Sequence, residues 1–329
     1  MYLINIKEFE RYGYTIQWFL TDVAKYLALW SISKATEKYN FNYVLGGGTA
    51  LNDVYFPRDR RRFSRDVDLY LVDVKPDLFQ EYVNSYLRSI GLYKVIDVLG
   101  EAIVVQGLIY VGIRGNNNTY RFRIALPKDT PFGLKMTEII PYNLKMKPDF
   151  NRWYMKNKEE LPKVYEIEVS IFKGNKRYAN VIEEREYSVP ILGVVKWINL
   201  PSSFKVRVFS LEDLVASKIE AIVSGLVAKG VPSGKVTGRK TVKARDIYDV
   251  AITFLDELYD RTKLLKAFDV LGIDLKYGMK AFRLALLQTL FNPNKYREIV
   301  EFMPRLKMNL EKWVTIVLET YRKTLNITE

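Results

Sequence analysis

The sequence of 329 residues contains neither cysteine nor histidine. Without cysteine, a disulfide framework and a zinc–thiolate site are both excluded. Without histidine as well, a Ser–His–Asp triad, a Cys–His pair and most zinc enzymes are excluded. Catalysis by this chain would therefore depend on carboxylates, lysine, hydroxyl groups or a metal ion bound through oxygen atoms.

Long apolar runs are also missing. No stretch of 18 or more apolar residues occurs, so we expect no transmembrane helix and no membrane partner. The charged first residues, MYLINIKEFERYGY, do not have the pattern of a signal peptide. We therefore expect a cytoplasmic protein.

Positive charge, by contrast, is in excess, with a formal net charge of +13. Such an excess favours a polyanionic partner, namely nucleic acid, a nucleotide or anionic lipid. The alternative is that the charge serves only solubility. Hydrophobic residues make up 48% of the chain, so it can bury a substantial core.

The hydrophobic pattern predicts two lobes, an α+β lobe of residues 1–205 and a helical C-terminal lobe of residues 206–329. In the first lobe, strands are predicted in NYVLGGG, RDVDLYLVD, residues 94–126 and KVYEIEVSIFK, helices in residues 7–38 and KPDLFQEYVNSYLRSIGL, and a loop in residues 127–160. From Ser210 the spacing becomes helical, and Ser210 with Asp213 resembles a capping box. Residues 224–243 predict a basic loop.

Residues 46–73, GGGTALNDVYFPRDRRRFSRDVDLYLVD, combine a glycine turn, five arginines and two alternating aspartates. Asp66 and Asp68 share one face of the predicted strand, because residues i and i+2 point the same way. Carboxylates this close repel each other unless a cation lies between them. A magnesium ion, or manganese, held by the pair can bind a triphosphate and orient an attacking hydroxyl. The alternative is a solvated strand face.

The glycine turn fits the same chemistry. Gly46, Gly47 and Gly48 would let the backbone approach a phosphate, and Thr49 can cap the helix predicted after it. Ser64 and the arginines add phosphate donors, from positions 58, 60, 61, 62 and 65. Taken alone, a glycine turn is weak support, because most such turns are ordinary.

These residues carry a resemblance. GGTAL followed by RFSRDVDL resembles the first motif of nucleotidyltransferases of the AbiEii/AbiGii type, with Arg62, Ser64, Asp66 and Asp68 at the matching positions. These enzymes belong to the DNA polymerase β-like superfamily, and several are toxins of toxin–antitoxin pairs. Their second signature is a lysine-bearing helix followed by an Arg-Asp-x-x-Asp helix. SLEDLVASKIEA and ARDIYDV resemble it, although the interval between them is longer than in the family.

The resemblance implies an α+β fold with a polymerase β-like nucleotidyltransferase core, a mixed sheet and a mainly helical second lobe. It implies transfer of a nucleoside monophosphate from an NTP to an acceptor hydroxyl, with an RNA such as the 3′ end of a tRNA as acceptor. Growth arrest and a cognate antitoxin protein are implied with it.

The resemblance also implies site residues. Asp66 and Asp68 would bind the metal with a third carboxylate from a neighbouring strand, either Glu166 or Glu168 of YEIEVS; we prefer Glu168. The nucleotide would be bound by Gly47, Gly48, Thr49, Arg62, Ser64, Lys218 and Arg245. Catalysis would depend on Asp66, Asp68, Lys218 and Asp246, where Asp246 orients Lys218 or acts as a base.

Other interpretations stay open. Lys218 can be a lysine that extends to solvent from the edge of its helix, and Arg245 with Asp249 can be an ordinary i, i+4 ion pair. The acceptor can be a protein or a small molecule, with nucleotidyl or phosphoryl transfer, or the chain can be a non-catalytic nucleic-acid-binding module. A group of aromatic residues is interpreted as core, with base stacking as the alternative: Trp153, Tyr154, Tyr165, Phe172 and Tyr178.

Overall fold

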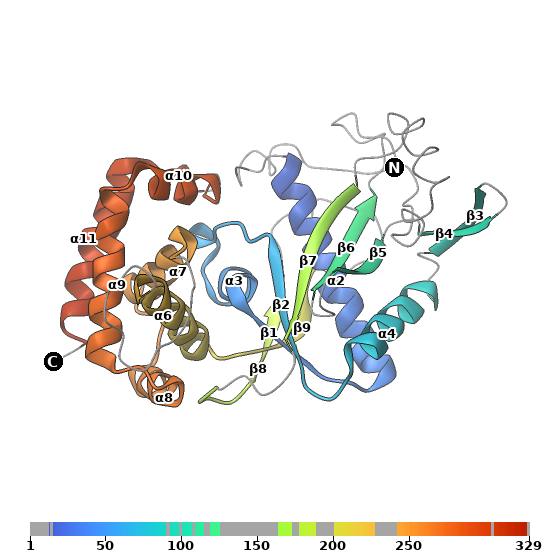
Figure 1. The fold of residues 1–329 in the computed structure, drawn as a ribbon, viewed down its shortest axis with the longest axis horizontal. Coiled ribbons are helices and arrows are strands. Elements are labelled where there is room, and N and C mark those ends of the chain that lie inside the picture. The colour runs from blue at the N-terminus through green and yellow to red at the C-terminus, as the bar shows by residue number, and fades with distance from the viewer. Residues whose placement is uncertain are drawn as a thin grey trace. The chain divides into compact units, whose positions relative to one another are not determined.

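The computed structural model describes residues 13, 16–89, 93–98, 101–106, 109–114, 119–125, 164–172, 178–188, 201–227, 242–303 and 306–327. The chain forms two compact units. The first, which we call the sheet unit, contains residues 1–44, 65–174 and 186–206. The second, the helical unit, contains residues 45–64, 175–185 and 207–329. Figure 1 labels their elements.

The main sheet is mixed and seven-stranded, with the order β5-β6-β7-β2-β1-β9-β8, and the sheet unit contains all of β2, β5, β6 and β7 and parts of β1, β8 and β9. Its strands are β1 (Tyr43–Gly46), β2 (Asp66–Leu71), β5 (Ile109–Arg114), β6 (Thr119–Ala125), β7 (Val164–Phe172), β8 (Glu183–Tyr187) and β9 (Phe204–Val208). Strands β2 and β7 are parallel, whereas β6 is antiparallel to β7. A separate antiparallel pair consists of β3 (Tyr93–Val98) and β4 (Glu101–Gln106).

The two faces of the central strands differ in burial. Val67, Leu69 and Leu71 on β2 are buried, whereas Asp66 and Asp68, which alternate with them, are partly exposed. On β7 the apolar residues at 167, 169 and 171 are likewise buried. Helix α2 (Ile16–Tyr39) packs against β7 and against α4 (Pro76–Ser89). One face of the sheet is therefore core, and the opposite face carries the acidic residues.

The helical unit contains most of the remaining helices. They are α3 (Gly47–Thr49), the π-helix η1 (Ala50–Tyr55), the 3-10 turn η2 (Arg58–Arg60), α6 (Leu211–Val227), α7 (Ala244–Leu255), α8 (Arg261–Leu271), α9 (Leu275–Leu290), α10 (Pro293–Glu301) and α11 (Leu310–Leu325). Helix α7 packs against α6, α9, α10 and α11. Its apolar side chains are almost fully buried, so α7 is the centre of this unit.

The predicted α+β fold class is confirmed. The strands predicted in NYVLGGG, RDVDLYLVD, KVYEIEVSIFK and residues 94–126 correspond to β1, β2, β7 and β3–β6. Ser210 caps helix α6 as predicted, because its Oγ accepts the Asp213 N–H at 3.1 Å, and the same Oγ donates to Asp213 Oδ2 at 2.8 Å. The division into lobes at residues 205 and 206 stays a prediction.

Two local predictions are wrong. Thr49 does not cap a helix; the helix begins at Gly47, and Thr49 lies inside it with helical angles and no capping bond from its side chain. Helix α6 extends to Val227, although a loop was predicted from residue 224. The predictions for residues 1–12, 127–160 and 228–241 lie outside the described residues. None of the described helices is long and apolar enough to span a membrane.

Candidate active site

The acidic residues of the sheet unit lie on two neighbouring strands. Asp66 on β2 is the direct Cα partner of Glu168 on β7, and Asp68 is the partner of Ser170. Asp66, Asp68 and Glu168 therefore share the exposed face of the sheet. Glu166 is two residues from Glu168 on β7, and on β6 the Cα partners of Glu166 and Glu168 are Arg123 and Arg121. The register with Asp66 supports the preference for Glu168 as the third carboxylate.

The acidic side chains of this face do not form a closed metal cage. Within the described residues, no group of three or more acidic side chains gathers closely enough to hold a metal ion. Asp66 and Asp68 also have partners of their own. The donor atoms still suit magnesium, which prefers carboxylate oxygens and keeps several waters rather than requiring an all-protein cage.

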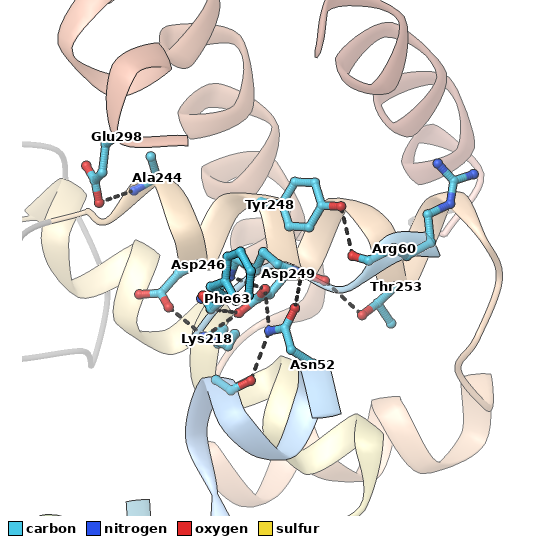
Figure 2. Close-up of polar contacts among 12 residues, drawn as sticks. Asn52, Arg60, Phe63, Lys218, Ala244, Asp246, Tyr248, Asp249, Thr253 and Glu298 are labelled. Atoms are coloured by element: carbon cyan, nitrogen blue, oxygen red, sulfur yellow. Dashed lines mark hydrogen bonds and ion pairs between the residues drawn. The ribbon is translucent and has the colours of Figure 1, made fainter. Parts of the chain in front are cut away.

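The helical unit contains a buried ionic cluster centred on Asp249 of α7 (Figure 2). Its carboxylate accepts two hydrogen bonds from Arg62, at 2.7 Å from Nε and 2.5 Å from Nη2. The side chains of Arg62 and Asp249 are 1% and 0% exposed. Such a bidentate pair is the strongest common form of ion pair and fixes the orientation of both partners.

Lys218 of α6 joins this cluster from the other side. Its Nζ lies 2.9 Å from Asp249 Oδ2 and donates to Asp246 Oδ1 at 2.6 Å. Figure 2 shows Lys218 directed toward both carboxylates of α7. Its side chain is 11% exposed, so it does not extend to solvent as a helix-edge lysine would. Two cations and two carboxylates thus balance each other in a largely buried site.

Asn52 connects the ionic cluster to the glycine turn. Its Nδ2 donates to the Gly48 carbonyl at 2.9 Å and to Asp249 Oδ1 at 3.1 Å. Its Oδ1 accepts the backbone N–H of Arg62 at 3.1 Å. One buried amide therefore holds three segments of the helical unit in place.

The glycine turn needs glycine for two different reasons. Gly47 has φ +66°, a left-handed conformation that residues with a side chain rarely adopt. A Cβ on Gly48 would lie 2.9 Å from Nη2 of Arg62 and 3.2 Å from Oγ of Ser64. Arg62 cannot easily give way, because Asp249 holds it. The backbone of the turn can thus come close to a ligand, whereas a side chain at Gly48 would collide with the protein.

Asp249, Lys218 and Arg62 are charged at neutral pH, because each stabilises the charge of its partners. Burial acts to raise the pKa of Asp249, but Arg62 and Lys218 outweigh burial and hold that pKa below its usual range. Burial acts to lower the pKa of Lys218, but Asp246 and Asp249 hold it above its usual range. In the same way, Asp249 outweighs burial and raises the pKa of Arg62.

The predicted arginines lie in different surroundings. Arg61 donates from Nε to the Phe56 carbonyl at 2.9 Å and is buried. Arg60 pairs with Asp256 at 3.0 Å, and Arg65 lies over the ring of Trp18 at 5.0 Å. These contacts are structural, so the interpretation of a loop that mainly contacts phosphates does not describe Arg61 and Arg62.

The other predicted residues are distributed as follows. Ser64 is buried beside Gly48, and Thr49 is fully buried. Arg245 lies over the ring of Phe302 at 5.6 Å. The ion pairs of Asp249 are with Arg62 and Lys218. The structure therefore brings Gly48, Ser64, Arg62, Lys218 and Asp246 together in the helical unit.

Sequence reasoning missed the central role of Asp249 and the part played by Asn52. Asp249 is three residues after Asp246, so both lie on one face of α7, and this spacing was a usable signal. Asn52 is four residues after Gly48, but nothing local distinguishes it from an exposed asparagine. The core interpretation of the aromatic group is wrong for Phe172 and Tyr178, which are 41% and 45% exposed. Trp153, Tyr154 and the side chain of Tyr165 lie outside the described part.

Comparison with known proteins identifies the family. Residues 27–132 and 150–319 match the sequence model of the nucleotidyl transferase AbiEii toxins of type IV toxin–antitoxin systems. The chain belongs to this family. The AbiEii match spans the glycine turn, the β2 carboxylates, Lys218 and Asp249, and it establishes the protein as a nucleotidyltransferase. The family resemblance inferred from the motifs is thereby confirmed.

Two solved structures are similar to this AbiEii chain. MenT4, the nucleotidyltransferase toxin Rv2826c from Mycobacterium tuberculosis H37Rv, is 13% identical with a TM-score of 0.42, over 98% of this chain and 97% of that one. An antigenic nucleotidyltransferase-like protein from Paracoccidioides brasiliensis is 13% identical with a TM-score of 0.31, over 82% and 89%. A comparison with curated proteins gave no match.

Proposed function

We propose that this AbiEii-type enzyme transfers a nucleoside monophosphate from an NTP to an acceptor hydroxyl in a metal-dependent reaction and releases pyrophosphate. The observation that carries the proposal is the row of Asp66, Asp68 and Glu168 on the exposed face of two parallel strands. Carboxylates placed side by side repel each other, and a divalent cation bound between them would remove this repulsion.

In this proposal Asp66, Asp68 and Glu168 hold magnesium, which manganese can replace. The ion supplies charge neutralisation of the triphosphate and a lowered pKa for the attacking hydroxyl. Two of the three donors, Asp66 and Asp68, are two and four residues after Ser64, so these metal ligands and a phosphate-binding residue come from one short segment.

The phosphates are bound by the glycine turn in this proposal. Gly47 and Gly48 are partly exposed, whereas Thr49 and Ser64 are buried, so the glycine backbone would meet the ligand first. Arg62 is 1% exposed and paired with Asp249, so it acts by packing beside Gly48 and not by replacing water around a phosphate. This assigns Arg62 a positioning role in nucleotide binding.

Lys218 neutralises charge on the leaving pyrophosphate, together with Arg245. The hydrogen bond that Lys218 Nζ donates to Asp246 at 2.6 Å supports the orienting role of Asp246 over that of a base, because this bond fixes the position of the ammonium group. Asp246 thus orients the ammonium group, and Asp249 forms a second ion pair with it at 2.9 Å.

The proposed acceptor is an RNA, with the 3′ end of a tRNA as the specific candidate. A net charge of +13 supports a polyanionic acceptor. Modification of tRNA in the cytoplasm would stop growth, in accord with the family's toxins, and a cognate antitoxin would then oppose it. Membership of the nucleotidyltransferase toxin family does not depend on which acceptor the enzyme uses.

The test is incubation of the full-length protein with magnesium, total RNA and each of the four NTPs, labelled either at the α- or at the γ-phosphate. The proposal predicts that the α-label, and not the γ-label, is transferred to RNA. Transfer of the γ-label would indicate phosphoryl transfer, label on protein would change the acceptor class, and RNA binding without transfer by folded protein would indicate a binding module.

A further inference from the structure

An aromatic pair lies on the same sheet face as the acidic residues. The rings of Tyr70 and Phe172 are nearly parallel, with an interplanar angle of 15° and centroids 4.7 Å apart. The two residues are direct Cα partners on β2 and β7. Phe172 is 41% exposed although one side of its ring is covered by Tyr70. The exposed area therefore belongs to the side of Phe172 that faces away from Tyr70.

The strand register places this pair in line with the proposed metal ligands. Asp66, Asp68 and Tyr70 alternate on one face of β2, and Glu168, Ser170 and Phe172 are their partners on β7. With a rise of about 3.3 Å per residue, the Tyr70 Cα lies about 7 Å beyond that of Asp68 and about 13 Å beyond that of Asp66. Carboxylates and aromatic rings thus follow one another along a single row.

A cross-strand aromatic pair stabilises a sheet by itself, and this role alone would explain the stack. It does not explain why the pair is on the polar face, next to Asp68, with Phe172 exposed to water. On the opposite face the apolar residues of β2 and β7 are buried. The exposed ring is therefore better explained by a ligand that covers it in the working enzyme.

The direction of the reaction indicates which ligand this is. In nucleotidyl transfer the attacking hydroxyl and the leaving pyrophosphate lie on opposite sides of the reacting phosphorus. The proposed phosphate-binding segment precedes Asp66 in the chain and enters β2 at its Asp66 end. With the phosphates bound beside Ser64, two residues before Asp66, in-line attack favours an acceptor that approaches from the Tyr70 end of the row.

We propose that the Tyr70–Phe172 pair is the binding site for the terminal nucleobase of the RNA acceptor, which stacks on the exposed side of the Phe172 ring. Every base has a π-face, so such a site accepts any base and selects an unpaired end over a duplex. This inference rests on the proposed function, since it requires an RNA acceptor at the carboxylates.

The experiment uses the full-length protein and a 12-nucleotide single-stranded RNA that ends in 2-aminopurine, whose fluorescence falls when the base stacks on an aromatic ring. Phe172→Ala removes the ring, Phe172→Leu keeps apolar volume without a π-face, and Phe172→Tyr keeps the ring. Phe291→Ala in the helical unit, where Phe291 is 85% exposed, is the matched control for loss of an exposed aromatic side chain.

The proposal predicts quenching by the native protein, by Phe172→Tyr and by Phe291→Ala, with about tenfold weaker RNA binding for Phe172→Ala and Phe172→Leu. In transfer assays the same two variants raise KM for RNA and leave KM for NTP unchanged. Absence of quenching by the native protein, or an effect on KM for NTP instead of RNA, overturns the inference. Because the fluorescence readout needs no turnover, it decides this inference even if transfer itself is not observed.

Discussion

The guanidinium group of Arg62 and the carboxylate of Asp249, 187 residues apart in the sequence, form a bidentate ion pair at 2.5 and 2.7 Å in the interior of the helical unit. Arg62 belongs to the segment that contains the glycine turn, and Asp249 to the helix that directs Lys218. The pair therefore connects the two motifs of the family. We expect this ion pair to stabilise the conformation of the glycine turn and of the helix that orients Lys218.

Removal of Asp249 should destabilise the protein strongly. Asp249→Ala leaves Arg62 and Lys218 as buried cations without their common partner, and we expect the free energy of unfolding to fall by about 3–5 kcal/mol. Urea denaturation followed by circular dichroism measures the change. The control is Asp256→Ala, which breaks the half-buried pair with Arg60 and should cost about 1 kcal/mol or less. Equal losses for both variants would contradict the central position of Asp249.

Acid should act on the same pair. Because the pKa of Asp249 is lower in the folded protein than in the unfolded chain, its charge contributes stability above the unfolded value of about 3.9, and this contribution is lost as pH falls below it. The free energy of unfolding of the native protein should therefore fall more steeply between pH 5 and pH 3, as rough limits, than that of Asp249→Asn. Parallel acid slopes for the two proteins would refute this prediction.

A side chain at Gly48 should disturb the turn. Gly48→Ala places a methyl group 2.9 Å from Arg62 Nη2, and the ion pair with Asp249 prevents a simple retreat. We expect a loss of about 1–3 kcal/mol in stability from overpacking, together with a higher KM for NTP. Thermal unfolding and steady-state kinetics measure the two effects. Gly272→Ala is a useful comparison, because a Cβ at that position meets no atom within 4 Å and only its φ of +69° is unfavourable.

Lys218 should matter for the rate more than for the fold. Lys218→Met keeps the length of the side chain but removes the ammonium group, and we expect kcat to fall by about 100- to 1,000-fold. Lys263→Met, at an exposed lysine 3.9 Å from Glu183, should leave kcat unchanged. Calorimetry must show that the Lys218 variant remains folded, because Asp246 and Asp249 lose a partner. Near-native kcat in a folded Lys218→Met variant would exclude the proposed role.

The parts of the fold that sequence predicted well depend on neighbouring residues. The alternation of Asp66 and Asp68 with Val67 and Leu69 specifies a strand with one buried face, and the structure has that strand. Ser210 and Asp213 are close enough in sequence to reveal a helix start, and their hydrogen bonds are present. In both cases the deciding contact spans three residues or fewer.

The parts that sequence could not predict depend on distant contacts or on backbone geometry. Nothing local shows that Arg62 faces Asp249 instead of a phosphate, because the contact forms only when α7 packs against the turn segment. Thr49 has the chemistry of a cap, but the left-handed Gly47 starts the helix two residues earlier. Within the candidate site, the sequence therefore predicted which residues take part better than it predicted the contacts between them.

The central claim is that the carboxylates of β2 bind the metal that makes nucleotidyl transfer possible. The most direct measurement is the rate of α-label transfer from NTP to RNA as magnesium is titrated, for the native protein and for Asp66→Asn/Asp68→Asn, with Glu81→Gln on the exposed side of α4 as control. We predict saturable dependence on magnesium for the native protein and the control, and a rate lower by about 100-fold or more for the double variant at every magnesium concentration, at a temperature where circular dichroism shows that variant to be folded. Transfer that persists in the double variant, or that does not require a divalent ion, would contradict the account.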